Sequence, residues 1–257
     1  MIKKMFAMLA KPRKLGNYFL ELRNMKRLTG MSYAALAAYS VRLGLSTGFH
    51  GYMSKMKRAA AAADGPLEVG GWIDLIQGFA IYAVIRHRKP AVIVETGVGP
   101  GSTSAFILKA LNDNRSGKLY SIDLPGNDAI EYPKLGKSFQ VHVPDGFRTG
   151  WLVSPELKKR WNLIIGDSKK ELPALLAKLG NIDIFLHDSL HTDEHILFEF
   201  NTAWPYLDGK SILLCDDVNT NWSLAFIDFC KNKALPYIVF NGRLGIAKVV
   251  NGGKKNE

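Results

Sequence analysis

The chain has 257 residues, of which 47% are hydrophobic and 22% charged, as in an ordinary globular protein. Two cysteines are too few for a disulfide scaffold and suit a reducing cytoplasm. The formal net charge of +11 lies in residues 1–60, where 12 lysines and arginines accompany a single acid, Glu21, so the rest of the chain is electrically balanced.

Residues 1–65 are predicted to form two or three short helices, broken near Thr29-Gly30 and between Gly48 and Gly51. The run Asp64-Gly-Pro66 reads as a linker. We therefore expect a basic helical appendage at 1–66 and a separate domain at 67–257. The basic segment suits either a solvated helical surface or contact with nucleic acid, an anionic membrane face or an acidic partner.

The apolar segment from Trp72 to Ile85 is too short to span a bilayer, which needs about 20 apolar residues. It also carries Asp74 and Gln77, so we predict a core helix over 72–87. The apolar run that follows Met1 is cut short by Lys11-Pro-Arg-Lys14, which argues against a targeting segment. We expect a cytoplasmic protein that is at most peripheral to a membrane.

From residue 91 onward, short apolar runs alternate with helical patterns, which indicates βαβ units and a doubly wound, mostly parallel sheet. Asn241-Gly242 suits a tight type I′ turn, so the last two strands should form a hairpin with one strand reversed. The segment 124–160 is long for a loop, so we expect an insertion of the structured kind that shapes a substrate pocket. Predicted strands are 91–95, 118–122, 162–165, 182–187, 210–215, 235–240 and 244–250; predicted helices are 102–113, 168–179, 192–204 and 221–232.

A glycine-rich turn follows the first of these strands, with the spacing Glu95-x-Gly97-x-Gly99-x-Gly101. Glycine permits positive φ and close approach of a ligand to the backbone. The helix that begins near Ser102 offers free N–H groups to an anion. The pattern is not GxGxxG, and the absence of a following lysine excludes a P-loop. A turn without a ligand stays open as an alternative.

Two further strands end in polar residues at the same rim. Asp123 closes the second strand, where an acid can accept hydrogen bonds from both ribose hydroxyls, or can act as a simple turn residue. Asp167 and Ser168 follow the third strand. Ser168 is a candidate N-cap with Glu171 completing a capping box, a role compatible with an adenine contact.

Three aspartates follow the next two strands, at positions 188, 216 and 217. Like charges that converge at a strand rim raise one another's pKa, and a hard divalent cation such as Mg²⁺ removes that cost. We predict a metal site formed by Asp188, Asp216 and Asp217. The alternative is that Asp216 or Asp217 caps the next helix.

The segment His191-Thr-Asp-Glu194-His195 spells H-x-x-E-H, an inverted zinc-protease motif. This reading leaves the glycine turn and the aspartates without a role, so we expect His195 to be a surface or packing histidine. His191, three residues after Asp188, is a candidate general base because histidine takes up a proton near neutral pH.

Together these positions resemble the class I S-adenosylmethionine-dependent methyltransferases over roughly residues 70–250, with their Rossmann-like seven-stranded sheet and reversed last strand. Within the class, the chain resembles catechol O-methyltransferase and the metal-dependent O-methyltransferases of sugars and antibiotics. The resemblance implies cofactor-binding roles and a magnesium site. The cofactor residues would be Glu95, Gly97, Gly99, Gly101, Thr103, Asp123, Asp167, Ser168 and Asp188, and the Mg²⁺ ligands Asp188, Asp216 and Asp217.

The implied reaction is O-methylation of a small molecule or glycan, with His191 as catalytic base. The catechol enzyme has asparagine and lysine where this chain has Asp217 and His191, so the metal site here is more acidic and the base less certain. A non-catalytic S-adenosylmethionine-binding protein and a nicotinamide-dependent oxidoreductase are the alternatives. We expect no nucleic-acid substrate, and the sequence leaves a homo-oligomer open.

Overall fold

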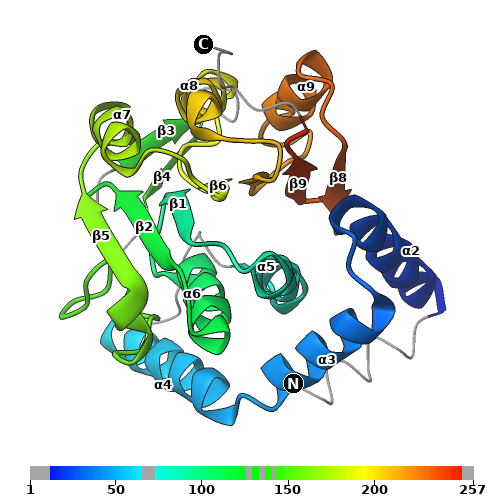
Figure 1. The fold of residues 1–257 in the computed structure, drawn as a ribbon. Helices are drawn as coiled ribbons and strands as arrows, with labels where there is room; N and C mark the ends of the chain where they lie inside the picture. The colour runs from blue at the N-terminus through cyan, green and yellow to red at the C-terminus, as the bar shows by residue number, and fades with distance from the viewer. Residues whose placement is uncertain (1–11, 65–72, 126–128, 133–136, 141–142, 251–257) are drawn as a thin grey trace.

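A computed structural model describes residues 12–64, 73–125, 129–132, 137–140 and 143–250 (Figure 1). Its main sheet has seven strands in the order β5-β2-β1-β6-β7-β9-β8. The strand order reverses between β1 and β6, which places a ligand site at the carboxyl ends of these strands. The strands are β1 (Val92–Thr96), β2 (Lys118–Asp123), β5 (Trp161–Ile165), β6 (Ile184–His187), β7 (Ile212–Cys215), β8 (Tyr237–Phe240) and β9 (Leu244–Lys248).

Helices cover both faces of this sheet (Figure 1). Successive residues of a strand point to opposite faces, so in β1 Ile93 packs with α5 and α6 while Val94 packs with α7, α8 and α9. The helices are α5 (Leu75–Arg88), α6 (Ser102–Asn114), α7 (Ser168–Leu179), α8 (Asp193–Ala203) and α9 (Ala225–Asn232). The predicted doubly wound α/β fold is confirmed.

The C-terminal hairpin is formed as predicted. Asn241 and Gly242 both have positive φ, 52° and 64°, as a type I′ turn requires. β9 pairs antiparallel with both β7 and β8, so β9 is the reversed strand.

The N-terminal residues form α2 (Pro12–Thr29), α3 (Tyr33–Gly44) and α4 (Thr47–Asp64). The break near Gly30 is confirmed, but the second break lies at Leu45-Ser46, and Gly48 and Gly51 lie inside α4. Both glycines have open space around them, so helix geometry costs them only entropy. Buried residues of these helices share the core with α5 and α6, and α3 packs on α5. The predicted boundary near residue 66 lies outside the described residues.

The insertion 124–160 contains strands that the sequence analysis did not assign. β3 (Ala129–Tyr132) and β4 (Lys137–Gln140) form a separate antiparallel pair, and the 3₁₀ turn η2 (Leu157–Arg160) precedes β5. A second 3₁₀ turn, η3 (Trp204–Tyr206), follows α8 outside this segment. Short strands without clear alternation escape pattern reading. Among the helices described, none combines the length and apolar character that crossing a bilayer demands.

Candidate active site

The glycine turn (Thr96–Gly101) joins β1 to α6 and needs its glycines. Gly97, Gly99 and Gly101 have φ values of 84°, 50° and 83°, which L side chains rarely adopt. A Cβ at Gly97 would overlap the backbone carbonyl of Asp188, and one at Gly101 would lie 2.8 Å from the Cα of Gly150. The turn is therefore packed against the β6 rim, with the N-terminus of α6 directly behind it.

Two hydrogen bonds tie this turn to the neighbouring strands. Gly99 N donates to Asp123 Oδ2 at 2.9 Å, and Thr103 Oγ1 donates to Asp188 Oδ2 at 2.9 Å. Burial raises the pKa of Asp123, while hydrogen bonds from the backbone of Gly99, Val98 and Leu124 oppose the rise. The structure thus brings the predicted glycine, ribose and metal residues to one rim.

Glu95 lies beneath this rim and is fully buried. Its Oε2 accepts hydrogen bonds from Ser104 Oγ at 2.7 Å and Ser121 Oγ at 2.6 Å. Burial raises its pKa to about 7 against these two bonds. Oε1 is buried without a hydrogen-bond partner, so one oxygen is left for a ligand group. The predicted cofactor role of Glu95 stays a prediction.

Asp167 and Ser168 lie at the start of α7, but their capping roles differ from the prediction. Asp167 is the N-cap, with Oδ1 accepting from Lys169 N at 2.9 Å, and Ser168 is the first helical residue. Ser168 Oγ instead lies 3.1 Å from His195 Nε2. Asp caps a helix as well as Ser does, so the aspartate one residue earlier takes the N-cap position.

The acid cluster (Asp188, Asp216 and Asp217) is formed at the ends of β6 and β7. Burial and the charge of Asp216 raise the pKa of Asp188 well above its usual range. Burial also raises the pKa of Asp216, and the charge of Arg243 opposes that rise. Neither Asp216 nor Asp217 caps a helix, because α9 begins at Ala225.

Arg243 supplies positive charge to this cluster. Its Nη2 lies 3.1 Å from Asp216 Oδ2, and its Nε forms an ion pair with Asp217 Oδ1. The hairpin turn positions Arg243, whose N–H donates to Phe240 O at 3.2 Å and whose carbonyl accepts from Val218 N at 2.8 Å. In the part of the chain that the structure describes, no three His, Cys, Asp or Glu residues are arranged to hold a metal ion.

His191 lies beside the acid cluster, as the base prediction requires. Its Nε2 is 3.5 Å from Asp217 Oδ2. Burial, together with the nearby His187 and Arg243, lowers the pKa of His191 to about 3. The imidazole is therefore neutral near pH 7, but a pKa this low also makes it a weak base. Burial and Asp216 raise the pKa of Asp217 to about 6, against the opposing charge of Arg243.

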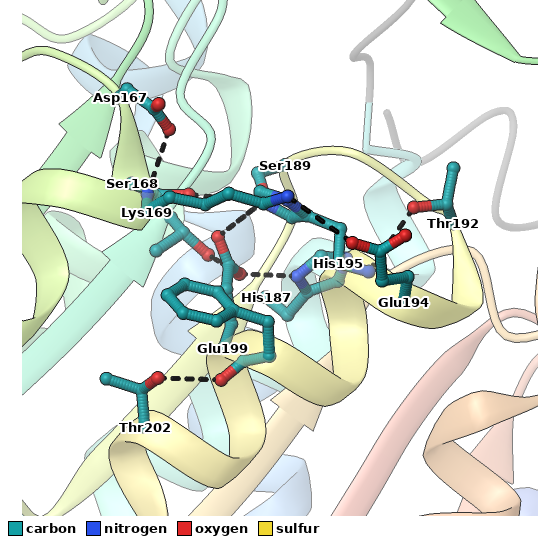
Figure 2. Close-up of polar contacts among 12 residues, drawn as sticks. Asp167, Ser168, Lys169, His187, Ser189, Thr192, Glu194, His195, Glu199 and Thr202 are labelled. Carbon is teal, nitrogen blue, oxygen red and sulfur yellow. Dashed lines mark hydrogen bonds and ion pairs between the residues drawn. The ribbon is translucent and has the colours of Figure 1, made fainter.

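Behind His191 lies the Glu199 network, drawn in Figure 2. Glu199 is fully buried on α8 and lies within hydrogen-bond distance of four side chains, three from β1 and the end of β6 and one from α8 itself. Its partners are Thr96 Oγ1 at 2.5 Å, His187 Nδ1 at 2.6 Å, Ser189 Oγ at 2.9 Å and His195 Nε2 at 2.9 Å. Burial alone would raise the pKa of Glu199, but the charges and hydrogen bonds of His187 and His195 lower it overall.

This network excludes the zinc-protease reading of H-x-x-E-H. His195 contacts Glu199 and Ser168, whereas His191 contacts Asp217. Glu194 points away with 88% of its side chain exposed. His195 is buried rather than on the helix surface, so it is a packing residue with a polar role.

Two residues of this rim were not predicted from the sequence. Glu199 is one helical turn after His195, and an acid four residues from a histidine is the one local signal that links them. Arg243 lies in a hairpin turn, where a basic residue reads as solvent-exposed. Its partners are 26 and 27 residues away, and the sequence carries no mark of that contact.

Comparison with known proteins agrees with this geometry. Residues 94–218 match the family model described as a methyltransferase domain. This range begins in β1, contains the glycine turn and the acid cluster, and ends just after β7. Curated protein sequences gave no match.

Solved structures with the same fold include three methyltransferases. The SAH-bound PaMTH1 of Podospora anserina is 16% identical, with a TM-score of 0.53 over 77% of this chain and 87% of its own. The O-methyltransferase TomG of Streptomyces achromogenes, in complex with SAM, is 15% identical, with a TM-score of 0.52 over 78% and 90%. The calicheamicin methyltransferase CalS11 is 18% identical, with a TM-score of 0.51 over 77% and 91%.

The chain therefore contains a methyltransferase domain, at residues 94–218, in a fold shared with solved methyltransferases that bind SAM or SAH.

Proposed function

We propose that this methyltransferase transfers the methyl group of S-adenosylmethionine to a hydroxyl oxygen of a small molecule or glycan. One observation carries the cofactor part of the proposal. The Gly99–Asp123 hydrogen bond joins the glycine turn to the end of β2, and the Thr103–Asp188 bond joins the start of α6 to the end of β6, which brings three strand ends together where one ligand could contact them all. The O-methyltransferases among the fold relatives support oxygen as the acceptor atom.

The residues divide along the cofactor as the resemblance implies. Gly97, Gly99 and Gly101 would admit the methionine part against the backbone, with Glu95 Oε1 and Thr103 beside it. Asp123 would accept from the ribose hydroxyls, and its hydrogen bond from Gly99 fixes the carboxylate in place. Asp167 and Ser168 would border the adenine. Asp188 lies between the cofactor side and the acid cluster and belongs to both.

The acceptor hydroxyl would lose its proton to His191. In the transfer, the sulfur–methyl bond breaks as the oxygen–methyl bond forms, which yields a methyl ether and S-adenosylhomocysteine. Neutral His191 accepts the hydroxyl proton, and Asp217 at 3.5 Å stabilises the resulting imidazolium. The chain's main contribution is alignment of donor and acceptor in a buried site.

We also propose that a divalent cation binds the acid cluster. Three carboxylates lie close to one guanidinium, and burial raises the pKa of each of them. A divalent cation would offset this excess of negative charge, and the all-oxygen ligands Asp188, Asp216 and Asp217 favour Mg²⁺ over zinc. When bound, Mg²⁺ would lower the pKa of an acceptor hydroxyl. In the described structure the three carboxylates are not arranged around one point, so their side chains would have to move to reach one ion.

Calorimetric titration of S-adenosylmethionine into the purified protein tests the cofactor, with NAD as the parallel control. We expect micromolar binding of the first and none of the second. Binding of NAD alone would return the chain to the oxidoreductase alternative. A screen of hydroxylated acceptors, with and without Mg²⁺, then measures methyl transfer to each acceptor.

The His191→Ala variant separates an enzyme from a non-catalytic binding protein. We expect turnover to fall ~10²-fold or more with cofactor binding largely retained, because a general base contributes only to the reaction. His87→Ala, on the far end of α5, is the matched control. Full turnover in His191→Ala would remove His191 as the base.

A further inference from the structure

The surface formed by α2 and α3 exposes apolar side chains that the catalytic domain does not cover. Ten large apolar residues are exposed in the described parts of the chain, and five of them lie between residues 19 and 45. On α3, Tyr33, Val41 and the following Leu45 are 49%, 60% and 72% exposed. Their spacing of four and eight residues places them on one helix face with the exposed Ala37. The opposite face, with Leu36 and Leu43, is buried.

Basic side chains border this apolar stripe. Arg23, Lys26 and Arg27 are exposed on α2, together with Phe19 and Leu20. Lys26 Nζ lies 4.6 Å from the ring centroid of Tyr33, so the basic and apolar groups meet where α2 leads into α3. The two helices form an arm along the outside of the molecule (Figure 1).

No exposed acid balances these charges over residues 12–60 of the described structure. Glu21 is the one acid there, and it is half-buried, with its pKa raised by burial and opposed by a hydrogen bond to the backbone of Asn241. The remainder of the chain carries equal numbers of basic and acidic residues. The excess of positive charge therefore lies on the N-terminal helices, and the exposed Arg23, Lys26 and Arg27 place part of it beside the apolar stripe.

We propose that this face, hereafter the α2–α3 face, binds the surface of an anionic lipid bilayer. Apolar side chains beside lysine and arginine fit a bilayer surface. The apolar side chains enter the boundary between headgroups and acyl chains, and the basic side chains contact the anionic headgroups. A second copy of the chain would bring two basic faces together, which their charge opposes. Nucleic acid would satisfy the basic groups but leave Val41 and Leu45 without an apolar partner.

This inference is independent of the proposed methyl transfer, because it uses none of the rim residues. α3 packs on α5 and α2 packs on β8 and β9, at the flank and the edge of the sheet. Binding through the α2–α3 face therefore leaves the carboxyl ends of the strands free.

Co-sedimentation of the full chain with vesicles tests the proposal without substrate or cofactor. The probes are vesicles of phosphatidylcholine alone and vesicles that also contain phosphatidylglycerol, each at low and high NaCl. We expect binding to the anionic vesicles at least tenfold stronger than to the neutral ones, and weaker at high salt because salt screens surface charges. Equal binding to both vesicles, or binding to neither, would overturn the proposal.

Two variants probe the two parts of the face. Val41→Ser with Leu45→Ser removes the apolar stripe, and Arg23→Gln with Lys26→Gln and Arg27→Gln removes the charge. We expect each to weaken binding to anionic vesicles at least tenfold. The matched controls are Leu224→Ser with Val250→Ser, and Lys118→Gln with Lys178→Gln and Lys231→Gln, all at exposed positions elsewhere. Equal losses in the controls would contradict a localised face.

Two further outcomes would also overturn the proposal. A dimer in size-exclusion chromatography that dissociates in the Val41→Ser and Leu45→Ser variant would assign the face to a second copy. Stronger binding to a duplex oligonucleotide than to anionic vesicles, lost in the arginine and lysine variant alone, would assign it to nucleic acid. Circular dichroism of each variant confirms that the helices are intact.

Discussion

The Glu199 network and the acid cluster are buried carboxylate sites at neighbouring strand ends, and they differ in how their charge is balanced. Glu199 is one carboxylate with four hydrogen-bond partners, and its pKa is lowered despite burial. In the acid cluster, three carboxylates have one guanidinium between them, and the pKa of each is raised by burial.

The difference separates structural support from reaction chemistry. A carboxylate whose lone pairs are all used holds its neighbours in place and has no capacity for a ligand. Carboxylates with unmet charge are held by the fold at a cost, and a cation or substrate relieves that cost. Through His187 and Ser189, Glu199 fixes the residues on either side of Asp188. The fully hydrogen-bonded Glu199 network therefore positions Asp188 of the acid cluster.

Removing the satisfied carboxylate should have the largest effect. Glu199→Ala leaves the buried His187, His195 and Thr96 without their shared acceptor, and we expect a loss of about 3–5 kcal/mol in the free energy of unfolding. Glu199→Gln keeps the shape and one acceptor oxygen, so the loss should be about 1–3 kcal/mol. Urea unfolding followed by circular dichroism measures both.

Thr202→Ala is the control for this series, because Thr202 lies on the same helix and donates only to Phe198 O. Equal stabilities of Glu199→Ala and Thr202→Ala would show that the network does not hold the rim.

Neutralising one carboxylate of the acid cluster should lower turnover and leave unfolding stability intact, whereas removing Glu199 lowers unfolding stability. Asp188→Asn removes a repelling charge and can still accept the hydrogen bond from Thr103, so we expect unfolding stability to be unchanged or higher. Turnover should fall ~10²-fold, which corresponds to about 2.7 kcal/mol of transition-state stabilisation. Steady-state kinetics and thermal unfolding on the same preparation test both halves. A variant that is both inactive and strongly destabilised would place Asp188 with the structural carboxylates.

The fold was largely predictable because its signals are local. Apolar runs of four to six residues, the spacing of Gly97, Gly99 and Gly101, and the Asn241-Gly242 turn each determine a short segment by sterics or burial. The β3–β4 pair was missed because it is short and lies beside turn residues. The position of the helix break before α4 was missed because Gly48 and Gly51 are tolerated where nothing crowds them.

The site was predictable in its carboxylates and less so in their partners. Parallel strands that end in Asp123, Asp188 and Asp216 must bring these acids to one edge. What each acid binds depends on side chains from distant segments, as with Arg243 on the hairpin turn and His195 beside Ser168. The spacing of His191 and His195 also fits a zinc-binding motif, but in the folded protein the two histidines contact different acids, Asp217 and Glu199.

Removing the single cation of the cluster should have a smaller effect. Arg243→Gln leaves Asp216 and Asp217 without their ion pairs, and because a third of the Arg243 side chain is exposed, we expect a loss of about 1–2 kcal/mol in unfolding stability. Under the proposed metal site, Mg²⁺ should restore much of this loss and bind the variant more tightly than the wild type. Thermal unfolding with and without MgCl₂ measures this, and Arg160→Gln is the control. A loss that Mg²⁺ leaves unchanged would mean that the cluster accepts a guanidinium alone.

Glu95 should reveal the cost of a partly satisfied carboxylate through pH alone. Burial raises its pKa to about 7 in the folded protein, against the ordinary glutamate value of 4.5. The folded state therefore holds the proton more tightly than the unfolded state does, and the stability that this contributes is complete below about pH 4.5 and is lost as the pH rises to about 7. The side chain in Glu95→Gln stays neutral across this pH range. We expect little difference in unfolding free energy from the wild type near the lower end of this window, and a variant more stable than the wild type above its upper end. Urea unfolding across the window measures the two slopes, and parallel slopes would show that Glu95 stays ionised in the folded state.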